Sequence, residues 1–206
     1  MKRSVLIVAE GEHELSGRTP EAALITLVRR LLGDGIELQV NAKRIRELKG
    51  HMHPGRGDRL GRKFVGIVRL AEREGFDAVI ILIDHDGDNN RLNSAKFAQD
   101  ATITSFPRAI GIAVRKFDAW FLADETALSK VLCRNVDRQP DPEGIFDPKS
   151  VCRSLRDSTG GEKRLRDLYS ELAAVVNLQT LGERCPVGFA VFAKRVESLK
   201  SLHYRD

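Results

Sequence analysis

Residues 78–88 read AVIILIDHDGD, an apolar and mostly β-branched run that stops abruptly at a cluster of acids. Such a run is typical of a strand buried on both faces, as in a parallel sheet covered by helices. The acids Asp84, Asp86 and Asp88 then lie at the carboxyl end of the strand, where open α/β sheets bind their ligands. Carboxylates this close repel one another, and their hard oxygens favour Mg²⁺, Mn²⁺ or Ca²⁺ as a counter-ion. The stretch therefore predicts an α/β fold with a metal site at one edge of its sheet.

Two other interpretations compete for the same acids. Asp, Gly and Asn are turn formers, so the cluster also fits a solvated turn. A calcium loop of the EF-hand type requires Gly at its sixth position and Glu at its twelfth. Counting from Asp84, these positions hold Asn89 and Ala95, which argues against such a loop. If the chain stays extended, Asp84 and Asp86 point to the same side and can face one ion, while Asp88 is a further ligand or part of the turn.

A second group of acids follows another apolar strand near the start of the sequence. Residues 4–9 read SVLIVA and lead directly into Glu10, Glu12 and Glu14. Taken alone, these acids also fit a polar loop after a strand. If the two strands are parallel neighbours, however, their carboxyl ends bring Glu10 close to the acids of residues 84–88. We therefore predict that Glu10 completes the metal site, with Glu12 or Glu14 as an accessory metal ligand or general base.

The rest of the pattern alternates helices with strands. A helix is expected to open at residues 19–21, Thr-Pro-Glu, and to close at Gly33 or Gly35. An alternating strand near a sheet edge follows over residues 36–40. Further elements are expected as helices over 60–74, 94–101, 125–132 with Asp124 as cap, 149–157, 162–177 and 186–200, and a strand over 109–114. We expect an α/β domain over residues 1–135, with a mostly parallel sheet of about four strands flanked by helices, and a C-terminal helical extension over 136–206 packed on it.

Several of these residues carry a resemblance to a known family. A strand ending in Glu-Gly, and a later strand ending in Asp-x-Asp, resemble the Toprim fold of topoisomerases, DnaG-type primases and OLD-family nucleases. More narrowly, four blocks are similar to the DUF4276 family of Toprim-like proteins: VAEGEHE (8–14), IDHD (83–86), KFDAWFLAD (116–124) and DPK (147–149). The resemblance implies a Toprim-like fold and a site for Mg²⁺ or Mn²⁺ built from these acids.

The resemblance also implies roles for residues farther along the chain. The family usually has Glu at the position of Asp118, where it supplies an acid to the same site. Because Asp keeps the charge but reaches less far, Asp118 is either a direct metal ligand or a water-bridged one. Lys149 either approaches a phosphate, as similar sequences suggest, or is simply exposed. A nucleophilic tyrosine of the topoisomerase type is not indicated, since Tyr169 and Tyr204 both fall in the late helical and terminal region.

A strongly basic segment lies between the second expected strand and the helix that follows it. Residues 43–63 combine many Lys and Arg residues with glycines and few apolar residues. The segment fits a solvated loop, or an arm that neutralises nucleic-acid phosphates without reading their sequence. In the second interpretation, the phosphate-binding residues are Lys43, Arg44, Arg46, Arg56, Arg59, Arg62 and Lys63. His51 and His53 have no third His or Cys nearby, which argues against a transition-metal site.

Composition narrows the remaining classes. A chain of 206 residues suffices for one α/β domain with a sizeable core, and a net charge of +5 agrees with a polyanionic partner such as nucleic acid. The three cysteines are odd in number and widely spaced, which supports neither a disulfide framework nor a zinc ribbon. No apolar stretch approaches the roughly 18 residues of a membrane span, and the first strand is too short for a signal-peptide core. We therefore expect a cytoplasmic protein with no membrane partner.

Together these features predict a nuclease that uses Mg²⁺ or Mn²⁺ to hydrolyse phosphodiester bonds in DNA or RNA, with Glu10, Asp84 and Asp86 as catalytic residues. Two alternatives stay open. One is a non-catalytic subunit that works with a separately encoded ATPase in a defence system, since the sequence has no Gly-x-x-x-x-Gly-Lys-Ser/Thr phosphate loop of its own. The other is a phosphohydrolase of a small nucleotide.

Overall fold

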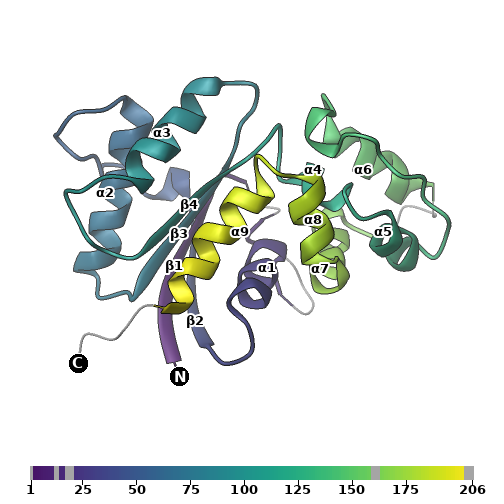
Figure 1. The fold of residues 1–206 in the computed structure, drawn as a ribbon, viewed down its shortest axis with the longest axis horizontal. Helices are drawn as coiled ribbons and strands as arrows, with labels where there is room; N and C mark the ends of the chain where they lie inside the picture. The colour runs from purple at the N-terminus through teal and green to yellow at the C-terminus, as the bar shows by residue number, and fades with distance from the viewer. Residues whose placement is uncertain (1, 12–13, 17–20, 159–162, 202–206) are drawn as a thin grey trace.

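Four parallel strands form the centre of the structure, a computed structural model that describes residues 2–11, 14–16, 21–158 and 163–201. They are paired in the order β2-β1-β3-β4 (Figure 1). Their bounds are β1 Lys2–Ala9, β2 Glu37–Arg44, β3 Ala78–Asp84 and β4 Arg108–Ala113. Helices flank the sheet, and the predicted α/β class is confirmed, as is the position of the second strand at an edge.

Successive residues of the central strands point to opposite faces, and both faces are buried. One face, here called the α1 face, is covered by α1 (Ala23–Leu32) and α9 (Phe189–Ser198), which pack on Ile7, Ala9, Ile80 and Leu82, among others. The opposite face, here called the α2 face, is covered by α2 (Arg59–Arg73) and α3 (Asn89–Gln99), which pack on Val8, Ile81 and Ile83, among others.

The order of the strands reverses between β1 and β3. From β1 the chain passes through α1 to β2 on one side, and then returns through α2 to β3 on the other side of β1. The helices that make these two connections lie on opposite faces. Ala9 of β1 pairs with Leu82 of β3, so the two strands end together. A reversal of this kind opens a crevice at the carboxyl ends of the strands, the usual ligand site of such sheets.

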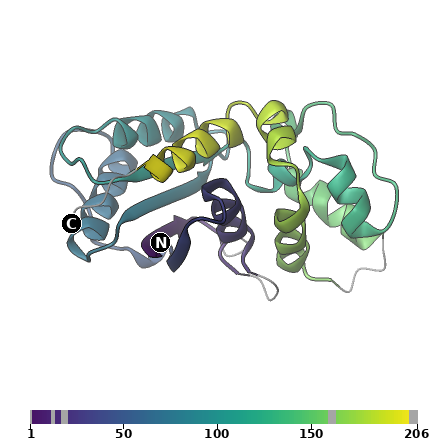
Figure 2. The same cartoon turned by 60° about the horizontal axis from the view of Figure 1, so that its bottom comes forward.

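The second half of the chain adds a helical lobe beside the sheet (Figure 2). Its helices are α4 (Asp118–Phe121), α5 (Glu125–Leu132), α6 (Pro148–Asp157), α7 (Leu165–Val175) and α8 (Leu178–Arg184). Short 3₁₀ turns occupy Ile45–Glu47 (η1), Pro142–Gly144 (η2) and Leu199–Ser201 (η3). The chain then returns to the sheet as α9, so residues on both sides of the predicted boundary at 135 share the core of the α1 face.

Several element boundaries differ from the prediction. The first helix begins at Ala23 rather than near residue 19, and Thr19 and Pro20 lie outside the described residues. The helix expected over 94–101 begins at Asn89, because the side chain of Asp88 caps it. The short helix α8 was not predicted. Asp124 does cap α5, as expected. No helix within the described ranges is both long and apolar enough to cross a membrane.

Candidate functional site

The acids at the ends of β1 and β3 lie side by side but on opposite faces of the sheet. Ala9 and Leu82 are partners in the register, and both pack on the α1 face. The next residue of the first strand, Glu10, therefore turns to the α2 face, whereas Asp84, two residues after Leu82, returns to the α1 face. The predicted meeting of the two strand ends is confirmed, and the strand alternation divides their acids into two groups.

Arg91 holds the group on the α2 face together. Its Nη1 atom lies 2.7 Å from Glu10 Oε2, 3.3 Å from Asp86 Oδ2 and 2.7 Å from the main-chain oxygen of Asp84. Both carboxylates are partly exposed to solvent. Three oxygens from two strand ends thus converge on one cationic nitrogen in the first turn of α3. Sequence reasoning missed Arg91, although the helix-capping sequence Asp88-Asn89-Asn90 places it there.

Asp86 reaches this group through a turn, not through an extended strand. The strand β3 ends at Asp84, and Asp86 has a φ of 49°, in the left-handed region. The N–H of Asp88 donates to the carbonyl of His85 at 2.9 Å and closes the turn. The expectation that Asp84 and Asp86 point to the same side was therefore wrong, because the positive φ breaks the alternation. The carboxylate of Asp86 lies with that of Glu10, whereas Asp84 contributes only its main-chain oxygen to this group.

Asp84 and Glu14 belong to the group on the α1 face. Asp84 Oδ1 accepts the N–H of Phe117 at 2.8 Å, yet burial and the nearby Glu14 raise the pKa of Asp84 to about 8. Glu14 is 7% exposed, and its Oε2 atom accepts no hydrogen bond from any described residue. Burial is the main cause that raises the pKa of Glu14 to about 7. Repulsion from Asp118 raises this pKa further, whereas attraction to Lys149 lowers it. Both carboxyls therefore hold protons more tightly than solvated acids do.

Asp118 completes this group from the start of α4. Its carboxylate accepts the hydroxyl of Tyr169 from α7, and both side chains are buried. The thiol of Cys152 lies 3.8 Å from the main-chain oxygen of Asp118. Burial, together with Cys152 and Asp118, raises the pKa of Tyr169 well above its ordinary value, so the phenol stays protonated and acts as the donor. Asp118 thus lies near Glu14 and Asp84, with one oxygen engaged by a tyrosine that the sequence did not point to, and its role as a metal ligand stays a prediction.

The other predicted acids and Lys149 are placed as follows. The side chain of Asp88 accepts the N–H of Asn90 at 2.9 Å and caps α3, which is a structural role. Glu12 lies outside the described residues. Lys149 lies in the first turn of α6, and its charge acts on Glu14. The α1-face group is accordingly Asp84, Glu14 and Asp118, and the charge of Lys149 acts on its member Glu14.

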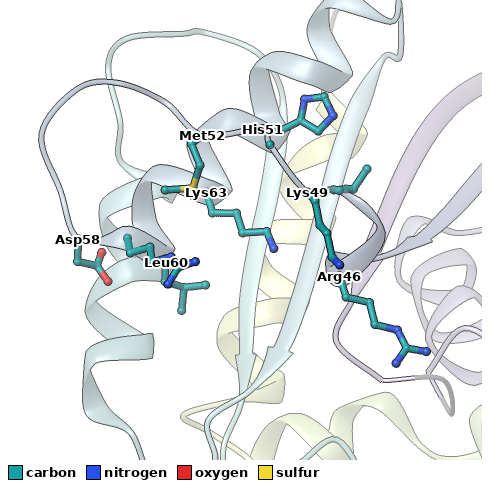
Figure 3. A pocket seen from close by; sticks show the side chains of 10 residues that line it. Arg46, Lys49, His51, Met52, Asp58, Leu60 and Lys63 are labelled. Atoms are coloured by element: carbon teal, nitrogen blue, oxygen red, sulfur yellow. The ribbon is translucent and has the colours of Figure 1, made fainter.

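The basic segment forms the wall of a pocket on the α2 face (Figure 3). The pocket has a volume of about 680 Å³ and lies between η1, the loop after it and the start of α2. Its charged and polar lining consists of Arg46, Lys49, His51, Asp58, Arg59 and Lys63, and its apolar lining of Leu48, Met52 and Leu60. Lys63 reaches from α2 toward Lys49, and Arg46 extends beyond Lys49.

Four predicted phosphate-binding residues do not line this pocket. Lys43 lies 3.9 Å from Glu74, and Arg44 is paired with Glu47 at 2.5 Å. Arg56 is exposed in the loop, and Arg62 lies in α2. Arg46, Arg59 and Lys63 do line it, together with Lys49 and His51, which were not among the predicted phosphate contacts. The spacing of the basic residues along the sequence could not separate the two sets, because the pocket depends on how the loop folds back.

The loop that carries the pocket is packed against α2 over part of its length. The N–H of His53 donates to the carbonyl of Arg62 at 3.1 Å. The main chain of His51 lies so close to Gly66 of α2 that a Cβ at Gly66 would collide with it. Asp58 caps α2 through the N–H of Gly61 and accepts the hydroxyl of Ser94 from α3 at 2.7 Å. The basic segment is therefore not wholly a solvated loop.

The pocket and the acids share one edge of the sheet. Arg44, at the end of β2, pairs in register with Ala9, directly before Glu10. Burial and the neighbouring Arg59 lower the pKa of Lys63, and the charge of Glu10 acts on Lys63 in the opposite direction. A cationic pocket and two groups of carboxylates therefore meet where β1 and β3 end.

Comparisons with protein-family models, with curated proteins and with solved structures give no match for this chain. The resemblance to the DUF4276 and Toprim proteins therefore stays a prediction that rests on the four sequence blocks. Within the described part of the chain, no three or more His, Cys, Asp or Glu side chains already form a cluster that could hold a metal ion. Two carboxylates of the edge are instead held by Arg91.

Proposed function

We propose that the protein is a phosphodiesterase that uses Mg²⁺ or Mn²⁺ to hydrolyse DNA or RNA, with Glu10, Asp84 and Asp86 at the ion. One observation carries the proposal: oxygens from two neighbouring strand ends converge on a single cationic atom, Arg91 Nη1, beside a pocket lined by basic side chains. A reaction on a phosphodiester requires carboxylates that hold metal ions and cationic side chains that hold phosphate, and this edge of the sheet carries both.

The donor atoms at the edge fit a hard divalent cation. All are carboxylate or main-chain oxygens, the ligands that Mg²⁺ prefers, and Mg²⁺ needs only a few of them because it keeps several waters. Glu14 offers a buried oxygen that accepts no hydrogen bond from the described residues. Repulsion between Asp84, Glu14 and Asp118 favours a cation as their neighbour. For an ion to bind between the two groups, Arg91 has to release Glu10 and Asp86.

The chain's own groups have distinct tasks in this proposal. When bound, the ion polarises a phosphoryl oxygen and lowers the pKa of water. Glu14 lies close enough to Asp84 for their charges to interact, and it takes the proton of the attacking water as general base. Lys63 and Lys49 hold the phosphate on the α2 face. The hydroxyl of Tyr169 donates a hydrogen bond to Asp118 and holds that carboxylate in place.

Substituting Asp84 by Asn tests this function. Asn keeps the size and can still accept the Phe117 N–H, but it removes the charge. With a plasmid and a single-stranded oligonucleotide as substrates in Mg²⁺ or Mn²⁺, Asp84→Asn is expected to lower cleavage at least about 100-fold, the order of effect of losing a metal ligand. The matched control Asp100→Asn removes an exposed acid at the far end of α3 and is expected to cleave like wild type.

Two results would count against the proposal. One is intact substrate with wild-type protein in both metals. The other is equal cleavage by wild type and Asp84→Asn, which would assign the activity to a contaminant. Circular dichroism of both variants checks that any loss comes from the site and not from unfolding.

A further inference from the structure

The pocket on the α2 face gathers four cationic side chains around one cavity. Arg46, Lys49, Arg59 and Lys63 all line it. Asp58, the one acid among the described residues that line the pocket, is already engaged, because its two oxygens accept the N–H of Gly61 at 3.0 Å and the hydroxyl of Ser94 at 2.7 Å. Like charges gathered in one cavity favour an anion with several acceptor oxygens, and phosphate is the common ligand of that kind.

The remaining lining of the pocket is apolar. Leu48, Met52 and Leu60 face the same cavity as the basic side chains, and Met52 is 40% exposed. A site for inorganic phosphate alone would not need such a surface. Apolar side chains beside cations suit a ligand with an anionic part and a weakly polar part, as in a nucleotide, whose base can pack against the adaptable, polarizable side chain of Met.

The size of the pocket favours a single nucleotide unit over a duplex. Its volume of about 680 Å³ lies within the range of about 300–1,000 Å³ that is usual for small-ligand pockets. A duplex is instead bound along an open surface by phosphate contacts spread over several turns. The loop is also packed against α2, through the hydrogen bond of the His53 N–H and the contact of the His51 main chain with Gly66. The walls of the pocket are therefore in position before a ligand binds.

From these observations we propose that the pocket binds one unpaired nucleotide, with its phosphate on Lys49 and Lys63 and its base against Met52. The inference deepens the proposed function and rests on it for the role of the bound nucleotide. With the phosphate on Lys63, whose charge interacts with Glu10, the phosphodiester enters the acid edge from the α2 face. The substrate class is then single-stranded nucleic acid, not intact duplex.

Calorimetric titration of the full chain in EDTA, where no hydrolysis occurs, measures the pocket by itself. Adenosine monophosphate is expected to bind at least about tenfold more tightly than either inorganic phosphate or adenosine, because only the nucleotide fills both parts of the pocket. A 5′-phosphorylated single-stranded oligonucleotide is expected to compete with it, and a blunt duplex is not. Equal affinity for phosphate and the nucleotide, or equal competition by the duplex, would overturn the proposal.

Two variants with one control locate the ligand. Lys63→Gln is expected to weaken binding of the nucleotide about tenfold, and Met52→Gln to weaken the nucleotide but not inorganic phosphate. Arg56→Gln, which removes the same charge from an exposed residue outside the pocket lining, is expected to bind like wild type. If Arg56→Gln and Lys63→Gln weaken binding equally, the affinity comes from the general charge of the loop and the pocket proposal fails.

The two proposals can fail separately. If the chain binds the nucleotide with the expected selectivity but cleaves no substrate in either metal, the pocket proposal holds and the hydrolytic function is rejected. If the chain cleaves single strands in an Asp84-dependent manner but does not bind adenosine monophosphate in EDTA, the hydrolytic function holds and the pocket proposal is rejected. Asp84→Asn is expected to bind the nucleotide like wild type in EDTA, since Asp84 lies on the α1 face.

Discussion

The acids on the two faces of the sheet edge balance their charge in opposite ways. On the α2 face, Glu10 and Asp86 are partly exposed and share the guanidinium of Arg91. On the α1 face, Asp84 and Glu14 are enclosed, and burial raises their pKa to about 8 and about 7. The first group shares one guanidinium as its counter-charge, and the second group binds protons more tightly than solvated acids do. The difference teaches that an ion between the two groups meets no guanidinium at Asp84 but has to displace Arg91 to reach Glu10 and Asp86.

The pH dependence of stability is the largest effect expected from the difference between the two faces. The ordinary pKa values of Asp84 and Glu14 are 3.8 and 4.5, so their folded values are raised. At these two carboxyls the folded state then binds more protons than the unfolded state between about pH 4 and pH 8, and their contribution to the free energy of unfolding falls as pH rises through that window. Without divalent cations, thermal unfolding is expected at a lower temperature at about pH 8.5 than at about pH 5.

Substitutions assign that slope to one face. Asp84→Asn is expected to flatten it and to raise the unfolding temperature near pH 8.5 by several degrees, because each kcal/mol is worth about 2–4 °C in a chain of this length. Asp86→Asn removes the same charge from the α2 face and leaves Arg91 with one partner fewer, so no gain is expected. A gain in Asp86→Asn equal to that in Asp84→Asn would show that the two faces do not differ.

The sequence was sufficient to predict that the acids meet at one edge of the sheet, but not that they divide into two groups on opposite faces. Apolar runs ending in Glu10 and Asp84 predicted two parallel strands and the meeting of their ends, because run composition and strand direction are local properties. The face to which each acid points depends on the pairing register and on the φ of Asp86, and the sequence sets neither by itself. Tyr169 comes from a helix 51 residues after Asp118, and no local spacing predicts such a contact.

Arg91 offers the next test, because it separates the two groups most directly. In Arg91→Gln, Glu10 and Asp86 lose their cation, and an incoming ion no longer competes with a guanidinium. Affinity for Mn²⁺, followed by electron paramagnetic resonance of the free ion, is expected to rise up to about tenfold, which corresponds to about 1.4 kcal/mol. The metal-free variant is expected to lose about 1 kcal/mol of stability, as for a partly exposed ion pair.

A matched control for Arg91 lies in the same helix. Lys96→Gln removes one positive charge from an exposed position of α3 and is expected to leave the affinity for Mn²⁺ unchanged. Weaker Mn²⁺ binding in Arg91→Gln than in Lys96→Gln would show that Arg91 positions the acids for the ion. Arg91 would then not be a competitor of the ion, and the two faces would act as one site already in the metal-free chain.

Asp88 gives the smallest expected effect and decides whether the third acid of the cluster belongs to either face. Its carboxylate is engaged by the N–H of Asn90 at the start of α3. Asn caps a helix as well as Asp does, so Asp88→Asn is expected to change stability by no more than about 0.5 kcal/mol, whereas Asp88→Ala is expected to cost about 1 kcal/mol. Neither is expected to change the affinity for Mn²⁺. If Asp88→Asn keeps its stability but binds Mn²⁺ more weakly, the carboxylate leaves its cap to hold the ion, and the sequence-based assignment of Asp88 as a ligand holds. Equal affinity together with the loss of stability in Asp88→Ala leaves only the capping role, because a cap responds to the loss of the acceptor oxygen and a ligand to the loss of charge.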